Sequence, residues 1–374
     1  MNKTRLKDNF IEMVKIYSPS KKEGNYAKYL VTLLTEMGAE IYLDNGNVKY
    51  DGDSPTIFAK FAGTVPGDGI TFSAHMDVIE PNENLKVIEE GLIIKTDGTT
   101  TLGADDKGGV AAVIEAIRTI KEENIAHRDI FAIFTPAEEI GMLGAKNIDW
   151  DKVPSHMQPA KNMIVLDNSG AAGTVAHSAP SRYFVKATFS GKKAHAGIEP
   201  EKGINAILMA AEALSNMNIG RIDELTTSNF SSIKSDFPTN VVPDACEFTG
   251  EIRSHSEEKI MEIIKEYEKA IKSATEKFGG SYKLEYVCEF PVLKPLDDLK
   301  FAKDFAKIYE EMGIESKLIV IGGGSDSNIF AQKGFNSIIL AVGMNNVHTV
   351  EEYMALEDLY KTTEALVKYI EKNI

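Results

Sequence analysis

Cysteine is scarce in this chain, and there is too little positive charge to balance the negative charge. The 374 residues include two cysteines, Cys246 and Cys288, which lack metal-type spacing and give no basis for a disulfide framework. A reducing compartment fits this composition. Acidic residues outnumber basic ones, and the formal net charge is −15. This balance argues against nucleic acid and anionic membrane surfaces as partners, and it equally fits an ordinary acidic protein of the cytosol.

Long apolar runs are missing as well. No run approaches the roughly 20 residues that a helix needs to cross a bilayer. The charged N-terminal segment is not followed by the apolar core of a signal peptide. We therefore expect a cytoplasmic protein. Hydrophobic residues make up 43% of the chain, as in soluble globular proteins, and the length allows two domains.

Short apolar segments alternate with helical patterns in two parts of the chain. Near-continuous apolar runs at 70–74, 130–135 and 163–166 predict strands of a sheet that is buried on both faces. The pattern predicts a helix over about 107–121, between two of these strands. The alternation resumes toward the C-terminus and predicts a three-layer α/β domain.

The pattern differs in the middle of the chain. Residues 180–292 follow the order strand, helix, strand, long helix and strand, which is typical of a small open-faced α+β sandwich. We expect this segment to be an insertion. Residues 1–179 and 293–374 would then form one discontinuous domain, and residues 180–292 a second domain.

Residues that bind metal ions gather at the ends of the predicted strands. The segment Thr101-Leu-Gly-Ala-Asp-Asp-Lys-Gly-Gly109 places Asp105 and Asp106 side by side at the start of a predicted helix, where their like charges favour a cation. One carboxylate can bridge two cations, whereas helix capping accounts for Asp106. His75 follows a predicted strand, and Asp77 lies two residues further on, where its carboxylate can orient the imidazole.

Three further positions complete this set. Glu138 and Glu139 follow another strand, so that one can bind a metal while the other acts as a general base. Asp167 ends a third strand, where an unpaired buried charge would be costly, and His348 follows a turn-rich segment. Each group alone also fits a capped helix or a solvated turn. Together, two histidines and three carboxylates with separate candidates for the base are what a two-metal hydrolase needs.

At these residues the chain resembles the M20 family of metallopeptidases and, within it, the peptidase T (tripeptide aminopeptidase) branch. The motifs keep the family's order along almost the whole chain: Thr-Leu-Gly-Ala-Asp-Asp-Lys-Gly-Gly, Phe-Thr-Pro-Ala-Glu-Glu-Ile-Gly, Gly-Lys-Lys-Ala-His-Ala-Gly, Gly-Gly-Gly-Ser-Asp and His-Thr-Val-Glu-Glu. The resemblance implies a zinc-peptidase-type catalytic domain with an inserted lid and dimerisation domain, and hence a homodimer.

The resemblance also implies two metal ions that share one bridging aspartate. Their expected ligands are His75, Asp105 and Asp167 for one ion, and Asp105, Glu139 and His348 for the other. Asp77 would orient His75, and Glu138 would be the general base. The ions are expected to be zinc, although cobalt or manganese suits the same ligands. A cis peptide bond is implied between Asp105 and Asp106.

In the inserted domain, the resemblance implies three substrate-binding residues. His195 of the Lys-Ala-His-Ala-Gly motif would reach a substrate carbonyl oxygen, commonly from the partner subunit. Asn240 and Arg253 would also contact the substrate. Arg253 can pair bidentately with a carboxylate of the substrate, and the alternative is a salt bridge at the end of a strand. Spacing alone would leave His195 as a histidine of a surface loop.

The activity implied by the resemblance is hydrolysis of short peptides, most closely by an aminopeptidase that acts on tripeptides. A water shared by two metal ions would be activated by Glu138 and would attack the substrate carbonyl. A carboxypeptidase, a dipeptidase or an N-acyl-amino-acid amidohydrolase would share this centre. Asn345 also departs from the branch's His-Gly-x-His-Glu pattern. A protein that binds metal and peptide without catalysis is a further alternative, but it would need neither Asp77 nor Glu138.

Overall fold

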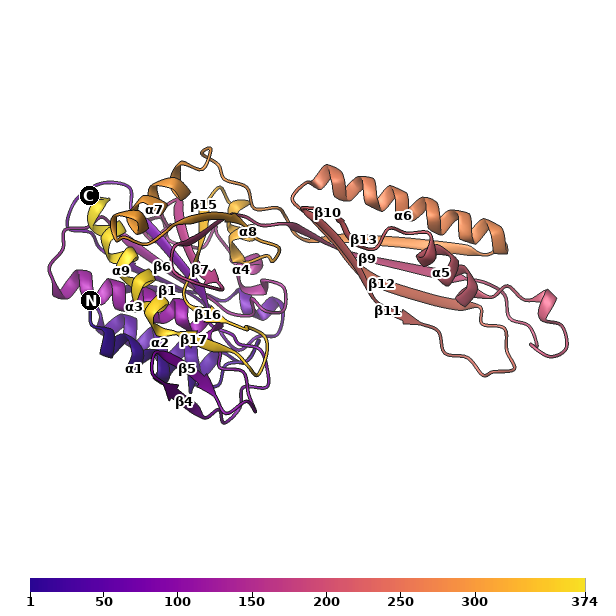
Figure 1. The fold of residues 1–374 in the computed structure, drawn as a ribbon, viewed down its shortest axis with the longest axis horizontal. Helices are drawn as coiled ribbons and strands as arrows, with labels where there is room; N and C mark the ends of the chain where they lie inside the picture. Colours follow the sequence, from indigo (N-terminus) through magenta and orange to yellow (C-terminus); the bar gives the residue numbers. More distant parts are fainter. Residues whose placement is uncertain (374) are drawn as a thin grey trace. The chain divides into compact units, whose positions relative to one another are not determined.

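The computed structural model describes residues 1–373, which divide into two compact units. The first unit comprises Met1–Ser178, Lys294–Ile321 and the described chain from Ser325 onward; the second comprises Ala179–Leu293 and Gly322–Gly324. Figure 1 follows the chain through both units. Among residues 1–373, none of the helices combines the length and the apolar character that a membrane span requires.

The main sheet of the first unit has eight strands within the described chain, in the order β1-β2-β6-β3-β7-β15-β8-β14. The strands are β1 (Glu40–Asp44), β2 (Thr56–Phe61), β3 (Ile70–His75), β6 (Ile130–Thr135), β7 (Asn162–Asn168), β8 (Thr174–Ser178), β14 (Lys317–Val320) and β15 (Asn336–Ala341). Strands β6, β3, β7 and β15 are neighbours and run parallel. Their carboxyl ends therefore meet at one edge of the sheet, where ligands bind in sheets of this kind.

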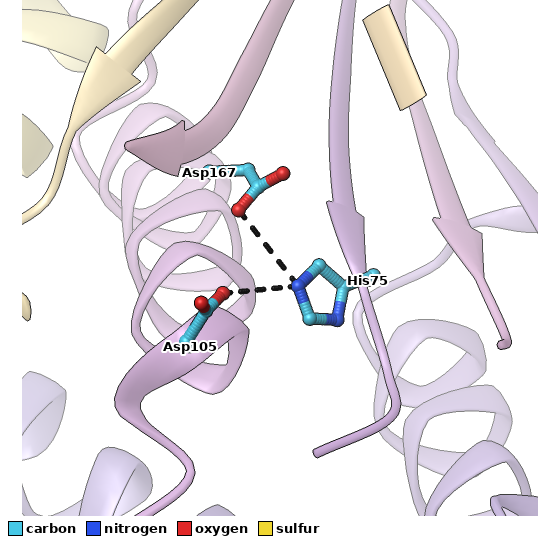
Figure 2. A group of neighbouring side chains, drawn as sticks. All are labelled: His75, Asp105 and Asp167. Carbon is cyan, nitrogen blue, oxygen red and sulfur yellow. Dashed lines mark hydrogen bonds and ion pairs between the residues drawn. The ribbon is translucent and has the colours of Figure 1, made fainter. Parts of the chain in front are cut away.

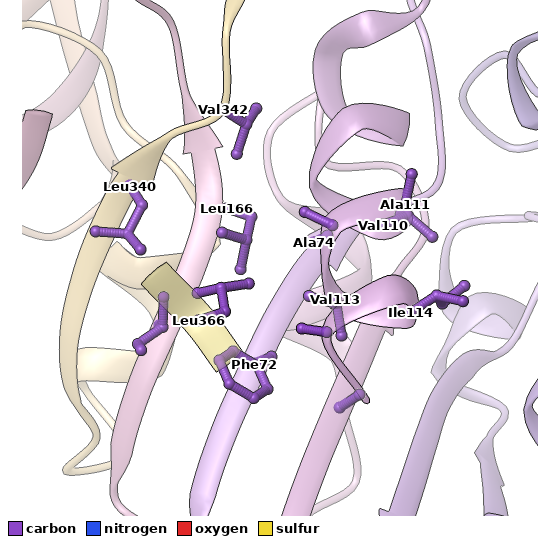
Figure 3. Close-up of a cluster of buried hydrophobic side chains, with 14 of the residues drawn as sticks. Phe72, Ala74, Val110, Ala111, Val113, Ile114, Leu166, Leu340, Val342 and Leu366 are labelled. Atoms are coloured by element: carbon purple, nitrogen blue, oxygen red, sulfur yellow. The ribbon is translucent and has the colours of Figure 1, made fainter. Parts of the chain in front are cut away.

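Helices cover both faces of this sheet, which confirms the predicted α/β class. They are α1 (Lys3–Val14), α2 (Gly24–Glu36), α3 (Ala104–Glu122), α4 (Leu143–Asn147), α7 (Lys300–Glu311), α8 (Asp326–Ala331) and α9 (Leu356–Lys372), with 3₁₀ turns at Gly46–Lys49 and Ser155–Met157. Successive strand residues point to opposite faces, so each face of the sheet has its own set of buried side chains. On one face, Phe72 of β3 and Val113 of α3 belong to the same hydrophobic core (Figure 3). On the other face, the rings of Phe58 and Phe330 lie 5.8 Å and 6.2 Å from the ring of Trp150.

A smaller sheet in the first unit was not predicted. Its four strands within the described residues lie in the order β16-β17-β5-β4. They are β4 (Val87–Glu90), β5 (Ile93–Thr96), β16 (Met344–Asn345) and β17 (Tyr353–Ala355). These strands are too short and too polar to give a clear alternation in the sequence. Strands β16 and β17 pair in antiparallel fashion, and the loop between them carries His348.

The second unit has the predicted character of an α+β sandwich. Its antiparallel sheet runs in the order β10-β11-β12-β9-β13 within the described residues. The elements are β9 (Ser181–Ser190), β10 (Gly220–Asp223), β11 (Thr226–Lys234), β12 (Ala245–Ser254), β13 (Ser281–Phe290), α5 (Ala206–Ser215), α6 (Glu257–Phe278) and a 3₁₀ turn at Pro200–Lys202. Both helices contribute to the hydrophobic clusters on one face of the sheet. Strand β11 was missed because it is rich in serine and threonine rather than apolar residues, and β10 was missed because its four residues include a single apolar side chain, Ile222.

Candidate metal centre

Three segments of the candidate site come together because β3 lies between β6 and β7. His75 is the last residue of β3, and Asp167 is the penultimate residue of β7. Glu138 and Glu139 lie in the turn that follows β6. The parallel order of the three strands places all four side chains at the same carboxyl edge of the sheet.

Asp105 enters the site from the start of α3. Gly103 has the left-handed φ of 75°, and the backbone of Asp105 (φ −83°, ψ 105°) is not helical. The peptide bond between Asp105 and Asp106 is cis. In this conformation the Asp105 carboxylate lies between two histidines: Oδ1 is 3.0 Å from Nε2 of His75, and Oδ2 is 3.2 Å from Nε2 of His348.

Two groups of donor atoms result, and Asp105 belongs to both. They are His75, Asp105 and Asp167 in one group, and Asp105, Glu139 and His348 in the other; the atoms within each group lie within 4.8 Å of one another. Figure 2 shows His75 facing both aspartates of the first group, with its Nε2 3.8 Å from Oδ1 of Asp167. In the second group, Nε2 of His348 lies 3.1 Å from Oε2 of Glu139.

These groups fit divalent cations. Oε1 of Glu139 is buried and has no hydrogen-bond partner among residues 1–373. Burial raises the pKa of Asp167 well above its ordinary value, and the charge of Asp105 raises it further. Hydrogen bonds to Asp105 and Glu139 raise the pKa of His348 to about 10, so the carboxylates stabilise a positive charge there. Imidazole nitrogen and carboxylate oxygen are zinc ligands in proteins, and the residues present are thus suited to bind two such ions.

Asp77 connects the imidazole of His75 to the acidic turn. Nδ1 of His75 lies 3.0 Å from the carbonyl oxygen of Asp77 and 3.4 Å from its Oδ1. The Asp77 carboxylate also accepts hydrogen bonds from the backbone N–H groups of Glu138 (2.9 Å) and Glu139 (3.1 Å), and from the hydroxyl of Ser20 (2.7 Å). It therefore holds the turn that carries Glu138 and Glu139, a contact that the sequence analysis did not anticipate.

Two other buried carboxylates hold the backbone around the site. Glu23, at the N-terminal cap of α2, accepts a hydrogen bond of 2.9 Å from the N–H of Ala137. Asp106 accepts hydrogen bonds of 3.2 Å from the N–H groups of His75 and Gly109. The contact to Gly109 is the helix-capping role expected for Asp106. The role of Glu23 was missed, because its backbone partner lies more than a hundred positions away in the chain.

Glu138 is a buried carboxyl group in an acidic environment. Its side chain belongs to neither donor group. Burial raises its pKa well above the ordinary value, and the charges of Asp326 and Glu139 add to this effect, while His75 opposes it. A carboxyl group with a raised pKa exchanges protons more readily near neutral pH than an ordinary glutamate does.

The three residues predicted to bind substrate lie in the second unit, but not together. The segment at His195 pairs with Val241, and the N–H of Ala196 donates to the carbonyl of Asn240 at 2.8 Å, so His195 and Asn240 are close. This pair lies just before the start of β12, whereas Arg253 lies near the end of that strand. The length of β12 from its start to Arg253 is roughly 25 Å at the usual rise per strand residue. Nε of Arg253 donates to Oε1 of Glu251 at 2.7 Å, which is the alternative salt bridge.

The chain is similar to a peptidase family, to a protein of Bacillus subtilis and to two solved peptidase structures. Residues 71–372 match the model of peptidase family M20/M25/M40. The chain is 38% identical over 372 residues to an uncharacterized protein, YqjE, of Bacillus subtilis (strain 168), covering 100% of this chain and 99% of the relative. It is similar to the solved structure of aminopeptidase PepT from Bacillus cereus ATCC 10987, with a TM-score of 0.92, 35% identity and coverage of 100% and 99%. A tripeptidase from Staphylococcus aureus subsp. aureus Mu50 gives a TM-score of 0.94, 31% identity and the same coverage.

Proposed function

Since the chain belongs to peptidase family M20/M25/M40 and is a peptidase T-like metallopeptidase, we propose that it is a two-metal aminopeptidase that releases the N-terminal residue of tripeptides. The main support is the position of Asp105, whose two carboxylate oxygens face different histidines. A single carboxylate in this position is suited to bridge two cations. The aminopeptidase and tripeptidase among the similar structures favour the choice of substrate.

The two donor groups would each hold one divalent ion, with zinc the ion best suited to their nitrogen and oxygen atoms. When bound, the ions would supply Lewis-acid chemistry, which polarises the scissile carbonyl and makes a water molecule more acidic. The nitrogen Nδ1 of His75 faces Asp77, so that Nε2 is presented to the ion. Cobalt and manganese remain alternative ions for the same ligands.

Glu138 would carry the proton in this reaction. We assign it the role of general base, which accepts a proton from the attacking water and then delivers it to the leaving amine. Its raised pKa suits both steps, because the group must hold the proton between them. Asp77 accepts hydrogen bonds from the N–H groups of both Glu138 and Glu139, so it would keep the base at a fixed position relative to the neighbouring ligand.

Product analysis tests the proposed substrate. Zinc- or cobalt-loaded protein is incubated with a free tripeptide, its N-acetylated form, a dipeptide and an N-acetyl amino acid, and the Glu138→Ala variant controls for contaminating peptidases. We expect release of the N-terminal residue from the free tripeptide and little reaction with the others. Cleavage mainly of the blocked substrates would instead make the enzyme a deacylase or a carboxypeptidase of the same family.

The roles of His195, Asn240 and Arg253 remain predictions, and we propose that a homodimer combines them. An extended tripeptide spans roughly 10 Å, whereas the two ends of β12 lie roughly 25 Å apart. One copy of the second unit is therefore unable to present His195 and Arg253 to the same tripeptide. A second copy of the chain can supply one of the two contacts.

Mixing two inactive variants tests this arrangement. In a dimer of one Glu138→Ala chain and one His195→Ala chain, one site has lost both residues and the other retains both if His195 acts on the partner's site. Random exchange of equal amounts should then restore roughly a quarter of the wild-type activity. Subunit exchange is verified independently with two differently tagged chains. Proven exchange without recovered activity would contradict the role of His195 in the partner's site.

A further inference from the structure

Glu352 is a buried carboxylate whose contacts point to the start of α3. It is the last residue of the His-Thr-Val-Glu-Glu motif, and only 2% of it is exposed. Its Oε2 accepts hydrogen bonds of 2.8 Å from the N–H groups of Leu102 and Gly103. Its Oε1 accepts a third, of 3.0 Å, from the N–H of Asp105. Glu352 thus contacts the backbone of the residue shared by both donor groups.

The three N–H groups form an anion-binding concavity. Gly103 has a left-handed backbone, and the N–H groups at the beginning of a helix have no partners within that helix. Successive backbone N–H groups in such a turn converge on one point and bind anions, and the positive end of the helix dipole adds to the attraction. The carboxylate of Glu352 satisfies these donors, and they in turn offset the cost of burying its charge.

The same short loop contacts Asp105 twice. The loop between β16 and β17 presents His348, whose Nε2 lies 3.2 Å from Oδ2 of Asp105. Four residues later, Glu352 holds the N–H of Asp105. We infer that Glu352 is a positioning residue. It holds the carboxylate of Asp105 at the position where it belongs to both donor groups, and keeps it beside the imidazole of His348. This inference rests on the proposed two-metal centre.

A matched pair of substitutions tests this role. In Glu352→Gln, the side chain keeps its size but one oxygen becomes an NH₂ group. The new amide can therefore satisfy either the pair of N–H groups from Leu102 and Gly103 or the N–H of Asp105, but not both. The neighbouring Glu351 is exposed, so Glu351→Gln makes the same chemical change without this contact.

Calorimetric titration of ion-free protein with Zn²⁺ gives a readout that does not depend on the substrate. We expect Glu352→Gln to weaken the binding of both ions by about 10- to 100-fold, as the loss of partners that hold metal ligands does elsewhere. Because Asp105 belongs to both groups, both binding steps should change. By contrast, Asp167→Asn and His348→Ala should each weaken mainly one step. Glu351→Gln should bind both ions like the wild type.

The outcomes separate this inference from the proposed function. A variant Glu352→Gln with a lower melting temperature but unchanged affinities would overturn the positioning role, because only a structural contribution would remain. If that variant does not fold, Glu352→Asp, which keeps the charge but is one methylene shorter, is titrated instead. Weaker binding of both ions by Glu352→Asp would support the positioning role, and unchanged affinities would overturn it. Fewer than two ions on the wild-type protein would overturn the two-metal centre itself, and this role with it.

Discussion

Replacement of Glu138 by glutamine is expected to lower kcat by about 10²- to 10⁴-fold, the usual contribution of a general acid or base. Glutamine keeps the shape of the side chain but does not accept and return the proton. Because Glu138 belongs to neither donor group, both ions should remain bound. The measurement combines steady-state kinetics on a tripeptide with the metal content of the purified variant.

Glu139 provides the matched control for this experiment. It is the next residue in the same turn, and Asp77 holds the N–H groups of both. Its carboxylate belongs to a donor group, so Glu139→Gln should lose affinity for one ion. The two variants should therefore separate proton transfer from metal binding. Wild-type turnover by Glu138→Gln would contradict the assignment of the base.

Replacement of Asp105 by alanine should abolish the binding of both ions at micromolar concentrations, and activity with it. One carboxylate serves both groups, and each would retain only two of its three donor residues. Ions that bind the folded chain stabilise it by about 4 kcal/mol at a thousandfold excess over Kd. The variant should therefore melt at a lower temperature than loaded wild-type protein. Metal analysis and thermal denaturation measure both effects.

Chelated wild-type protein is the control for the Asp105 variant. If the loss of stability comes from the missing ions, wild-type protein treated with a chelator should melt close to Asp105→Ala, and the chelator should not change the variant further. Two ions still bound to Asp105→Ala would show that this residue does not bridge them.

The parts of the fold that were predictable from the sequence are those with a strong local pattern. The strand Ile130–Thr135 is apolar at nearly every position because both faces of the sheet are covered, and its predicted bounds match the structure. Strand β11 (Thr226–Lys234) has no such signal, since much of it is exposed and polar. The four-stranded sheet joins two short local strand pairs through the pairing of β5 with β17, which are distant in the sequence, and local periodicity does not reveal such a pairing.

The candidate site shows the same division. The ligand-type residues could be proposed from their chemistry and their positions after strands. The residues that hold the surrounding backbone could not, because their partners are N–H groups that every residue except proline carries. Glu351 and Glu352 are adjacent and chemically identical, yet one is exposed and the other buried. The salt bridge of Arg253, by contrast, could be proposed from the sequence, because its partner Glu251 lies only two residues away.

The position of His348 and Glu352 after all other donor residues in the sequence has a consequence for biosynthesis. When β7 has left the ribosome, the nascent chain already carries His75, Asp105 and Asp167, the donors of one ion. The residues of the second unit follow, and they can fold as a domain while the first unit still lacks β15 and α9. Only after residue 352 emerges are the second set of donors and the support for Asp105 both available. Binding of an ion to the second group of donors is thus expected only after residue 352 has emerged.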